Sequence, residues 1–126
     1  MVEKIVNYDI GGAELLEHKW FNHLDDKDVI KREIKSGETH SVIVRKNDVS
    51  IFGAFISIYL DSVHIREVGG RFPKNIELLE IYCKALAKFK KVNKLTVCAK
   101  RKGVENIAEK MDFIFDDTSN HFEKAI

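Results

Sequence analysis

The sequence predicts an α/β (α+β) fold in which a mixed, mostly antiparallel sheet is flanked by helices. The spacing of apolar residues switches repeatedly between the period of a helix and that of a strand, in the order β-α-α-β-β-β-α-β-α-β-β. Three successive strands favour antiparallel pairing, because short turns can join neighbouring antiparallel strands. The chain has 126 residues, 44% of them hydrophobic and 33% charged, so we expect one domain over residues 1–126.

The first third of the chain predicts one strand and two helices. Ile5 to Tyr8 are typical of a short strand, which should end at Asp9 and the following glycine pair. A second helix is predicted over about Lys27–Lys35, because acidic residues favour its N-terminus and Gly37 can stop it. The first helix is predicted from residue 13 to about residue 24, where apolar side chains recur at helical spacing: Leu15, Leu16, Trp20, Phe21 and Leu24.

The middle of the chain predicts three strands joined by tight turns. Residues 41–45 form a β-branched run, and residues 50–60 are almost continuously apolar. Residues 63–68 alternate between apolar and polar, as a half-buried strand does, and Gly69 and Gly70 should end this strand.

The last part of the chain contains the clearest helix, over about Lys74–Lys91, with apolar residues three and four positions apart. Lys94–Ala99 predicts a short buried strand, and Gly103–Met111 predicts a short amphipathic helix. Phe113–Phe115 and His121–Ile126 predict two closing strands around a polar turn.

Charge and cysteine content argue against several classes of protein. Lys and Arg (21) nearly balance Asp and Glu (20), which argues against a dedicated nucleic-acid-binding module. Cys83 and Cys98 are too few for a disulfide framework and fit reduced, buried thiols. The N-terminal residues lack the apolar region of a signal peptide, and no apolar run approaches membrane-spanning length. We therefore expect a cytoplasmic protein that does not enter a membrane.

The chain shows no pattern of metal ligands or of a nucleophilic triad. His18 and His23 are five residues apart and so share no helix face well, and the other three histidines are scattered. The motif G-x-S-x-G is absent. We expect neither a bound metal nor a Ser-His-Asp triad.

The order of elements resembles that of the GNAT-type N-acetyltransferase fold, over essentially the whole chain. The best local match is residues 101–113, RKGVENIAEKMDF, against the family pattern Asn-x-x-Ala-x-x-Leu-Tyr-x-Lys-x-Gly-Phe. It keeps Ile107 at the Leu place, Lys110 and Phe113. It departs where Asn, Tyr (often the general acid) and Gly are usual, with Arg101, Ala108 and Asp112.

The loop after the fourth predicted strand resembles the family's pyrophosphate loop, Arg/Gln-x-x-Gly-x-Gly/Ala, in part. In the family, backbone N–H groups of this loop and the positive end of the next helix hold the coenzyme A pyrophosphate. Here Lys74 and Ile76 replace the glycines, and Pro73 lacks an N–H. The resemblance implies that acetyl-CoA, if it binds, contacts Gly69, Gly70, Arg71, Lys74, Asn75 and Arg101.

These departures make the chain similar to the short, diverged GNAT-like proteins that bacteriophage genomes often carry. They favour a non-catalytic protein that has lost its cofactor and acts by binding a protein partner. In a phage-encoded protein, the location would be the host cytoplasm or the virion. The sequence leaves open whether copies of the chain associate with one another.

The alternative is a small N-acetyltransferase that moves an acetyl group from acetyl-CoA to an amine. Such a reaction needs a base for the amine, and Glu67, near the end of the fourth predicted strand, is the first candidate, with His64 next. The competing interpretation is that both side chains simply face solvent from an alternating strand.

A weaker alternative is a nucleic-acid-associated protein. Lys84, Lys88 and Lys91 are spaced to form one stripe on the long predicted helix. Such a stripe is usually the solvated side of a helix, and neither an Arg-rich tract nor interleaved aromatic residues accompany it.

Overall fold

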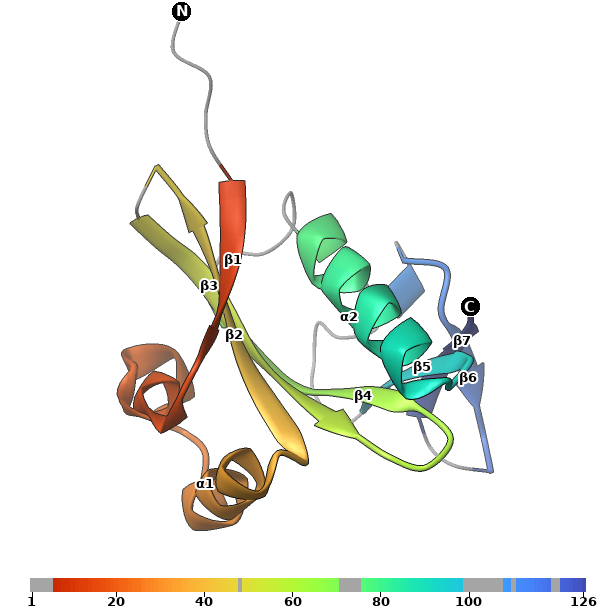
Figure 1. The fold of residues 1–126 in the computed structure, drawn as a ribbon, viewed down its shortest axis with the longest axis horizontal. Helices are drawn as coiled ribbons and strands as arrows, with labels where there is room; N and C mark the ends of the chain where they lie inside the picture. The colour runs from red at the N-terminus through yellow and green to blue at the C-terminus, as the bar shows by residue number, and fades with distance from the viewer. Residues whose placement is uncertain (1–5, 48, 71–75, 99–107, 110, 119–120) are drawn as a thin grey trace, which may run out of the picture.

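A seven-stranded sheet runs through the molecule in the order β1-β2-β3-β4-β5-β7-β6 (Figure 1). Only the pairing of β4 with β5 is parallel among the described neighbours. This arrangement confirms the predicted mixed, mostly antiparallel sheet. The strands are β1 (Val6–Gly11), β2 (Thr39–Lys46), β3 (Val49–Ile58), β4 (Val63–Gly70), β5 (Lys94–Cys98), β6 (Ile114–Asp116) and β7 (His121–Ala125).

The helices follow one another along the chain in the predicted order. Two short 3-10 helices, η1 (Ala13–Glu17) and η2 (Lys19–Phe21), precede α1 (Lys27–Ser36), and α2 (Ile76–Lys90) connects β4 to β5. The structure, a computed structural model, describes residues 6–47, 49–70, 76–98, 108–109, 111–118 and 121–126. Most of the helix predicted over residues 103–111 lies outside the described residues, and residues 108 and 109 are helical.

The single helix predicted over residues 13–24 is wrong, because His18 interrupts it. His18 has an extended backbone, with φ −69° and ψ 142°, and its Nδ1 accepts a hydrogen bond from the Trp20 N–H over 3.3 Å. The His18 and Trp20 rings also lie against each other, with centroids 3.8 Å apart. This local side-chain bond competes with helical hydrogen bonding.

One strand ends at the predicted glycine pair and another ends early. The first strand ends at Gly11 and is paired with β2 throughout. The third strand ends at Ile58 instead of Leu60, because the Tyr59 N–H donates to the Ser62 carbonyl and closes a turn. Leu60 is consequently fully exposed at that turn.

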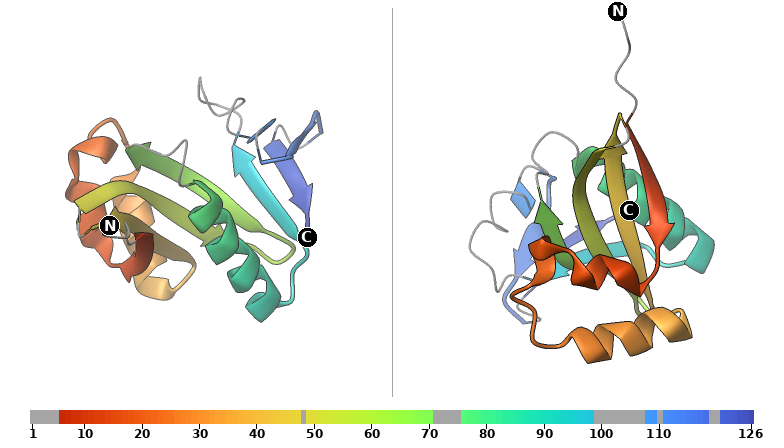
Figure 2. Two further views of the ribbon diagram at one scale, coloured as in Figure 1. Left: turned by 90° about the horizontal axis from the view of Figure 1, so that it is seen from above. Right: turned by 90° about the vertical axis from the view of Figure 1, so that its left-hand side faces the viewer.

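Each face of the sheet carries its own apolar core (Figure 2). On one face, α2 packs through Cys83 and Ala87 onto side chains of β2 to β5 and β7, including Val42, Phe52 and Leu95. On the other face, η1, η2 and α1 pack onto Phe55 and Ile43, with fully buried Leu16, Phe21 and Ile30. The alternation of strand side chains places these two sets on opposite faces.

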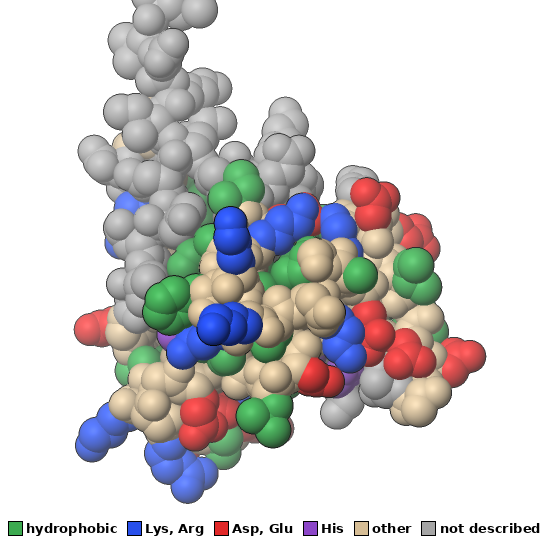
Figure 3. All heavy atoms as spheres, turned by 45° about the vertical axis from the view of Figure 1, so that its right-hand side comes forward, with side chains coloured by type: hydrophobic (Ala, Val, Ile, Leu, Met, Phe, Trp, Pro, Cys, Tyr) green, Lys and Arg blue, Asp and Glu red, His purple; other side chains and the backbone are tan. Residues whose placement is uncertain are grey.

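The outward side of α2 is exposed, as expected for the solvated side of an amphipathic helix. Lys84 and Lys88 are exposed there, and Lys91 is exposed just after the end of the helix, with φ 59°. Lys84 lies 3.2 Å from the Glu80 carboxylate, one helical turn away. Figure 3 shows Lys and Arg side chains gathered over this part of the surface.

Two glycines adopt positive φ for different structural reasons. Gly37 ends α1 in the left-handed conformation, with φ 86°, and a Cβ placed there would meet nothing within 4 Å. Gly70 ends β4 with φ 103°, and a Cβ there would lie 2.6 Å from the Ile51 carbonyl oxygen and 2.7 Å from the Phe52 Cα. Backbone atoms of a neighbouring strand cannot yield as a flexible side chain can.

We expect Gly70→Ala to destabilise the protein by about 2–4 kcal/mol and Gly37→Ala by only about 1 kcal/mol. Both substitutions introduce strain at positive φ, but only the first also forces an alanine methyl against backbone atoms. Urea unfolding monitored by circular dichroism measures the two losses. Equal losses of stability in the two variants would show that the close approach of β3 to Gly70 does not contribute to the effect.

Candidate functional site

The sheet opens between β4 and β5, its one parallel pair. These strands pair through only three residue pairs: Val63 with Leu95, His64 with Thr96, and Ile65 with Val97. β4 then continues through residues 66–70 with no pairing to β5 among the described residues, and the two strands diverge toward their C-terminal ends (Figure 2). Among the described residues, β5 therefore pairs with β4 only over the first part of this edge.

A bulge lies where the divergence begins. Phe55 on β3 pairs with Glu67, whereas the next residue, Ile56, pairs with Ile65, so Arg66 is an extra residue on β4. A bulge bends its strand and increases the local twist. It also places Glu67 on the same face as Phe55, the face that carries α1.

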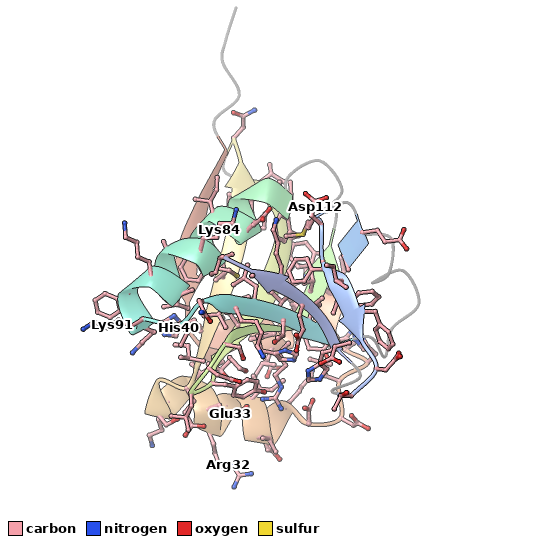
Figure 4. The ribbon with its side chains drawn as sticks, turned by 90° about the vertical axis from the view of Figure 1, so that its right-hand side faces the viewer. Arg32, Glu33, His40, Lys84, Lys91 and Asp112 are labelled. Atoms are coloured by element: carbon pink, nitrogen blue, oxygen red, sulfur yellow. The ribbon has the colours of Figure 1, made fainter. Side chains whose placement is uncertain are left out.

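Two carboxylates of the α1 region hold the bulged residue. The Arg66 guanidinium donates to the Glu33 carboxylate and, over 3.0 Å, to Asp26 Oδ2. Glu33 points from α1 toward the sheet, whereas Arg32 points away from it (Figure 4). The sequence prediction used the acidic residues at 26–28 only as a helix N-terminus, but the Asp26 side chain makes no capping hydrogen bond. Arg66 therefore joins α1 to the sheet at the start of the opening.

His64 is buried in the narrow, paired part of the junction. Its side chain is 5% exposed, and its Nδ1 lies 2.7 Å from the Thr96 hydroxyl on β5. Its ring contacts those of Tyr59 and His121, at centroid distances of 5.5 and 4.9 Å. The interpretation that His64 faces solvent is therefore wrong. A polar Thr96 inside an otherwise apolar strand was the sequence signal for a buried polar partner.

The surroundings of His64 keep its ring uncharged at neutral pH. Burial, and secondarily the proximity of His121, lower the pKa of His64 to about 4. A neutral imidazole of this kind can hold a hydrogen bond, but it is a weak base.

Glu67 lies beyond the residues of β4 that pair with β5, opposite Phe55 on β3, and is half-buried. The two sequence candidates thus occupy different places: His64 lies inside the junction and Glu67 lies at the opening. Of these two, Glu67 is the carboxylate that a molecule in the opening could meet.

The cofactor-binding candidates begin at the end of β4. Gly69 and Gly70 are its last residues, and the chain next reaches the described structure at Ile76, the first residue of α2. The described part of β4 thus ends and α2 begins on either side of residues 71–75, and helix N-termini in general favour anions. The other candidates lie outside the described residues: Arg71, Lys74, Asn75 and Arg101.

Three of the positions singled out in the sequence also have packing roles. A Cβ at Gly69 would lie 2.8 Å from the Trp20 Cβ, so this glycine lets η2 approach β4. Gly70 lies against the β3 backbone. Ala108, which the sequence resemblance aligns with the tyrosine of the family pattern, is 1% exposed within the core beneath α2.

Metal and membrane binding gain no support from the part of the chain that the structure describes. Within it, no three His, Cys, Asp or Glu side chains converge closely enough to hold a metal ion. Within the same residues, none of the helices has both the length and the apolar character needed to cross a bilayer.

Comparison with solved structures identifies the fold. The PaiA N-acetyltransferase of Thermoplasma acidophilum, in complex with coenzyme A, is similar over 97% of this chain and 99% of its own, with a TM-score of 0.71 and 13% identity. A GNAT family acetyltransferase from Elizabethkingia anophelis with acetyl-CoA bound has a TM-score of 0.64, at 12% identity over 96% and 98% of the two chains. The chain therefore has the GNAT acetyltransferase fold.

A third similar structure contains a protein partner. It is a mutant of the toxin AtaT bound to the C-terminus of the antitoxin AtaR and to acetyl-CoA, with a TM-score of 0.61 and 11% identity over 95% and 92% of the two chains. No protein-family profile matches the sequence. A search of curated proteins likewise finds no match.

We expect the buried His64 to make the stability of the protein depend on pH. The pKa is about 4 in the folded protein and near its ordinary value of 6.5 in the unfolded chain. The unfolded chain therefore takes up the proton first, and stability falls as the pH drops from 6.5 to 4. The difference between the two pKa values corresponds to a loss of about 3 kcal/mol in the free energy of unfolding.

Urea unfolding of the native protein and of His64→Gln at pH 7 and pH 4 tests this expectation. Glutamine can still hydrogen-bond to Thr96 but cannot take up the proton. The native protein should lose about 3 kcal/mol more than the variant over this interval. Equal losses in the two proteins would contradict the assignment of the pH dependence to His64.

Proposed function

We propose that this chain, which has the GNAT acetyltransferase fold, binds acyl-CoA in the opening between β4 and β5 and transfers the acetyl group to an amine. The observation that carries the proposal is the loss of β4–β5 pairing after Ile65 and Val97. Where two neighbouring strands part, the edge of a strand presents backbone hydrogen-bonding groups with which an extended ligand can pair.

The chemistry of coenzyme A matches this edge. Its pantetheine arm is extended and contains two amide groups, which can pair with a strand edge as an added peptide strand does. Its pyrophosphate would then lie toward the loop between Gly70 and Ile76, where α2 begins. Arg71, Lys74, Asn75 and Arg101 are proposed to contact the phosphates, with side-chain charge replacing part of the missing glycine loop.

Glu67 is the proposed general base. The amine nitrogen attacks the thioester carbonyl, the carbon–sulfur bond breaks, and coenzyme A leaves as the thiolate or thiol. The proton that the amine loses goes to the base. His64 suits this role poorly, because its low pKa makes it a weak base and the junction encloses it. We assign His64 to holding β4 and β5 together through Thr96.

A second candidate is a non-catalytic protein that keeps the fold without the cofactor and binds a protein partner. The packing roles of Gly69, Gly70 and Ala108 favour this candidate, because these residues are then explained without any ligand. The complex of AtaT with its antitoxin is an example of a protein partner on a related fold. Origin from a phage genome would fit this reading.

Calorimetric titration with acetyl-CoA, and in parallel with coenzyme A, distinguishes the two candidates. We expect both ligands to bind with a dissociation constant in the micromolar range, roughly −8 kcal/mol. Arg71→Ala should weaken binding about tenfold through loss of a charge-assisted phosphate contact. Arg32→Ala, at an exposed position of α1, is the control and should leave affinity unchanged. No heat at millimolar ligand would overturn the acetyltransferase proposal and favour the second candidate.

Glu67→Gln should separate catalysis from binding. We expect the rate of coenzyme A release from acetyl-CoA, measured with a thiol reagent across a panel of amines, to fall by about 10²-fold. The affinity for acetyl-CoA should stay unchanged, because the substitution preserves size and removes only the titratable group. If the rate of the variant equals that of the native protein with a reactive amine, Glu67 is not the base.

A further inference from the structure

Exposed apolar side chains lie among the lysines on the outward side of α2. Ile81 is 56% exposed and Phe89 is 78% exposed, and the exposed Ala85 lies between them at a spacing of four residues. This spacing aligns the three along one side of the helix, and we call them the apolar stripe. Single exposed apolar residues are common on protein surfaces, whereas an aligned set is typical of a binding surface.

The two edges of the apolar stripe differ in character. Lys84 and Lys88 are exposed, and each directly precedes a member of the stripe in the chain, so both lie along one edge. Tyr82 and Leu86 directly follow members of the stripe and pack toward the core along the other edge. Figure 3 shows hydrophobic side chains among Lys and Arg side chains over this part of the surface. The stripe therefore has one basic edge and one apolar edge.

The positive charge beside the apolar stripe is only partly neutralised within the chain. Lys84 lies 3.2 Å from the Glu80 carboxylate. Among the described residues, no carboxylate forms an ion pair with Lys88. The Lys90 ammonium lies 5.6 Å from the centre of the Phe89 ring, which keeps a further positive charge next to the stripe. The surface therefore favours a partner that carries carboxylates.

We infer that an acidic amphipathic helix of a partner protein docks on α2 along the apolar stripe. Charge complementarity indicates the character of this partner, because the basic edge attracts carboxylates and the stripe attracts apolar side chains. Ala85 is small, so a second helix can approach α2 closely there and pack its larger apolar side chains against Ile81 and Phe89. Carboxylates along one edge of that helix then meet Lys84 and Lys88.

Two other occupants explain this surface less completely. A nucleic acid would use the lysines, but its phosphates would leave Ile81 and Phe89 without apolar partners. A flat lipid surface would not use the small Ala85, whose size matters only to a partner that packs closely between its larger neighbours. The surface includes neither Glu67 nor the opening between β4 and β5, so the inference stands or falls independently of the proposed function.

Fluorescence anisotropy with labelled synthetic helices is the first test. The probe is a peptide of about 18 residues, about five helical turns, with leucines along one side and glutamates along one edge of that side. We expect it to bind the native chain with a dissociation constant of about 10–100 μM. A peptide with lysine for each glutamate, and one with serine for each leucine, should bind at least about tenfold more weakly. If either control peptide binds as tightly as the probe, or if the probe does not bind, the inference is wrong.

Two double variants of α2 test the residues that the inference assigns. Lys84→Glu with Lys88→Glu makes the basic edge acidic and should weaken binding of the glutamate peptide at least about tenfold, because like charges then meet. The same variant should bind the lysine peptide with near-native affinity, since opposite charges again face each other. Ile81→Ser with Phe89→Ser removes the large members of the apolar stripe and should weaken binding of the glutamate peptide at least about tenfold.

Matched controls change the same kinds of side chain elsewhere. Arg32→Glu with Lys35→Glu makes the same change of charge on exposed positions of α1, and Leu60→Ser removes a fully exposed leucine. Both should bind the glutamate peptide as the native chain does, and circular dichroism confirms that each variant folds. Equal losses of affinity in the controls, or no loss in folded variants of α2, would show that α2 is not the docking surface.

Vesicles of phosphatidylcholine and phosphatidylserine, and a short DNA duplex, distinguish the other occupants. We expect neither to bind the native chain more tightly than the glutamate peptide does. If either binds more tightly, and Lys84→Glu with Lys88→Glu abolishes that binding, α2 recognises a lipid surface or a nucleic acid and the inference of a helical partner is overturned.

Discussion

The pairing of Arg66 with two carboxylates is the constraint on which the opening in the sheet depends. An extra residue in β4 bends the strand at the position where its pairing with β5 ends. Asp26 and Glu33 fix the bulged side chain, and α1 is thereby attached to the same point. Because a half-buried guanidinium is costly without partners, the bulge, the position of α1 and the divergence of the two strands form one structural unit.

The order of elements could be predicted from the sequence because it depends on local periodicity. Strands such as β2 and helices such as α2 display their buried residues at characteristic spacings. The interruption at His18 escaped prediction because a hydrogen bond between a side chain and its neighbouring backbone left the apolar spacing unchanged. The end of β3 was missed for a similar reason, since Tyr59 and Leu60 are apolar but belong to a turn.

The candidate site was less accessible to sequence reasoning, because its properties arise from residues distant in the chain. His64 is buried by partners on β5 and β7, and no local pattern reports their proximity. Arg66 meets a carboxylate 33 positions earlier. Gly69 was chosen for its nearness to a phosphate-loop pattern, whereas the structure gives it a contact with Trp20. A glycine in a sequence therefore identifies a close approach without identifying what approaches.

The short junction between β4 and β5 also divides the sheet mechanically. β1 to β4 form one antiparallel block and β5 to β7 another, and the two are joined by three residue pairs and by the packing of α2. Narrowly connected blocks separate at a lower free energy than the blocks themselves unfold. We therefore expect bending to be concentrated at the β4–β5 junction, and backbone amides there to exchange with solvent earliest. A molecule bound across this junction would hold the two blocks together and reduce this motion.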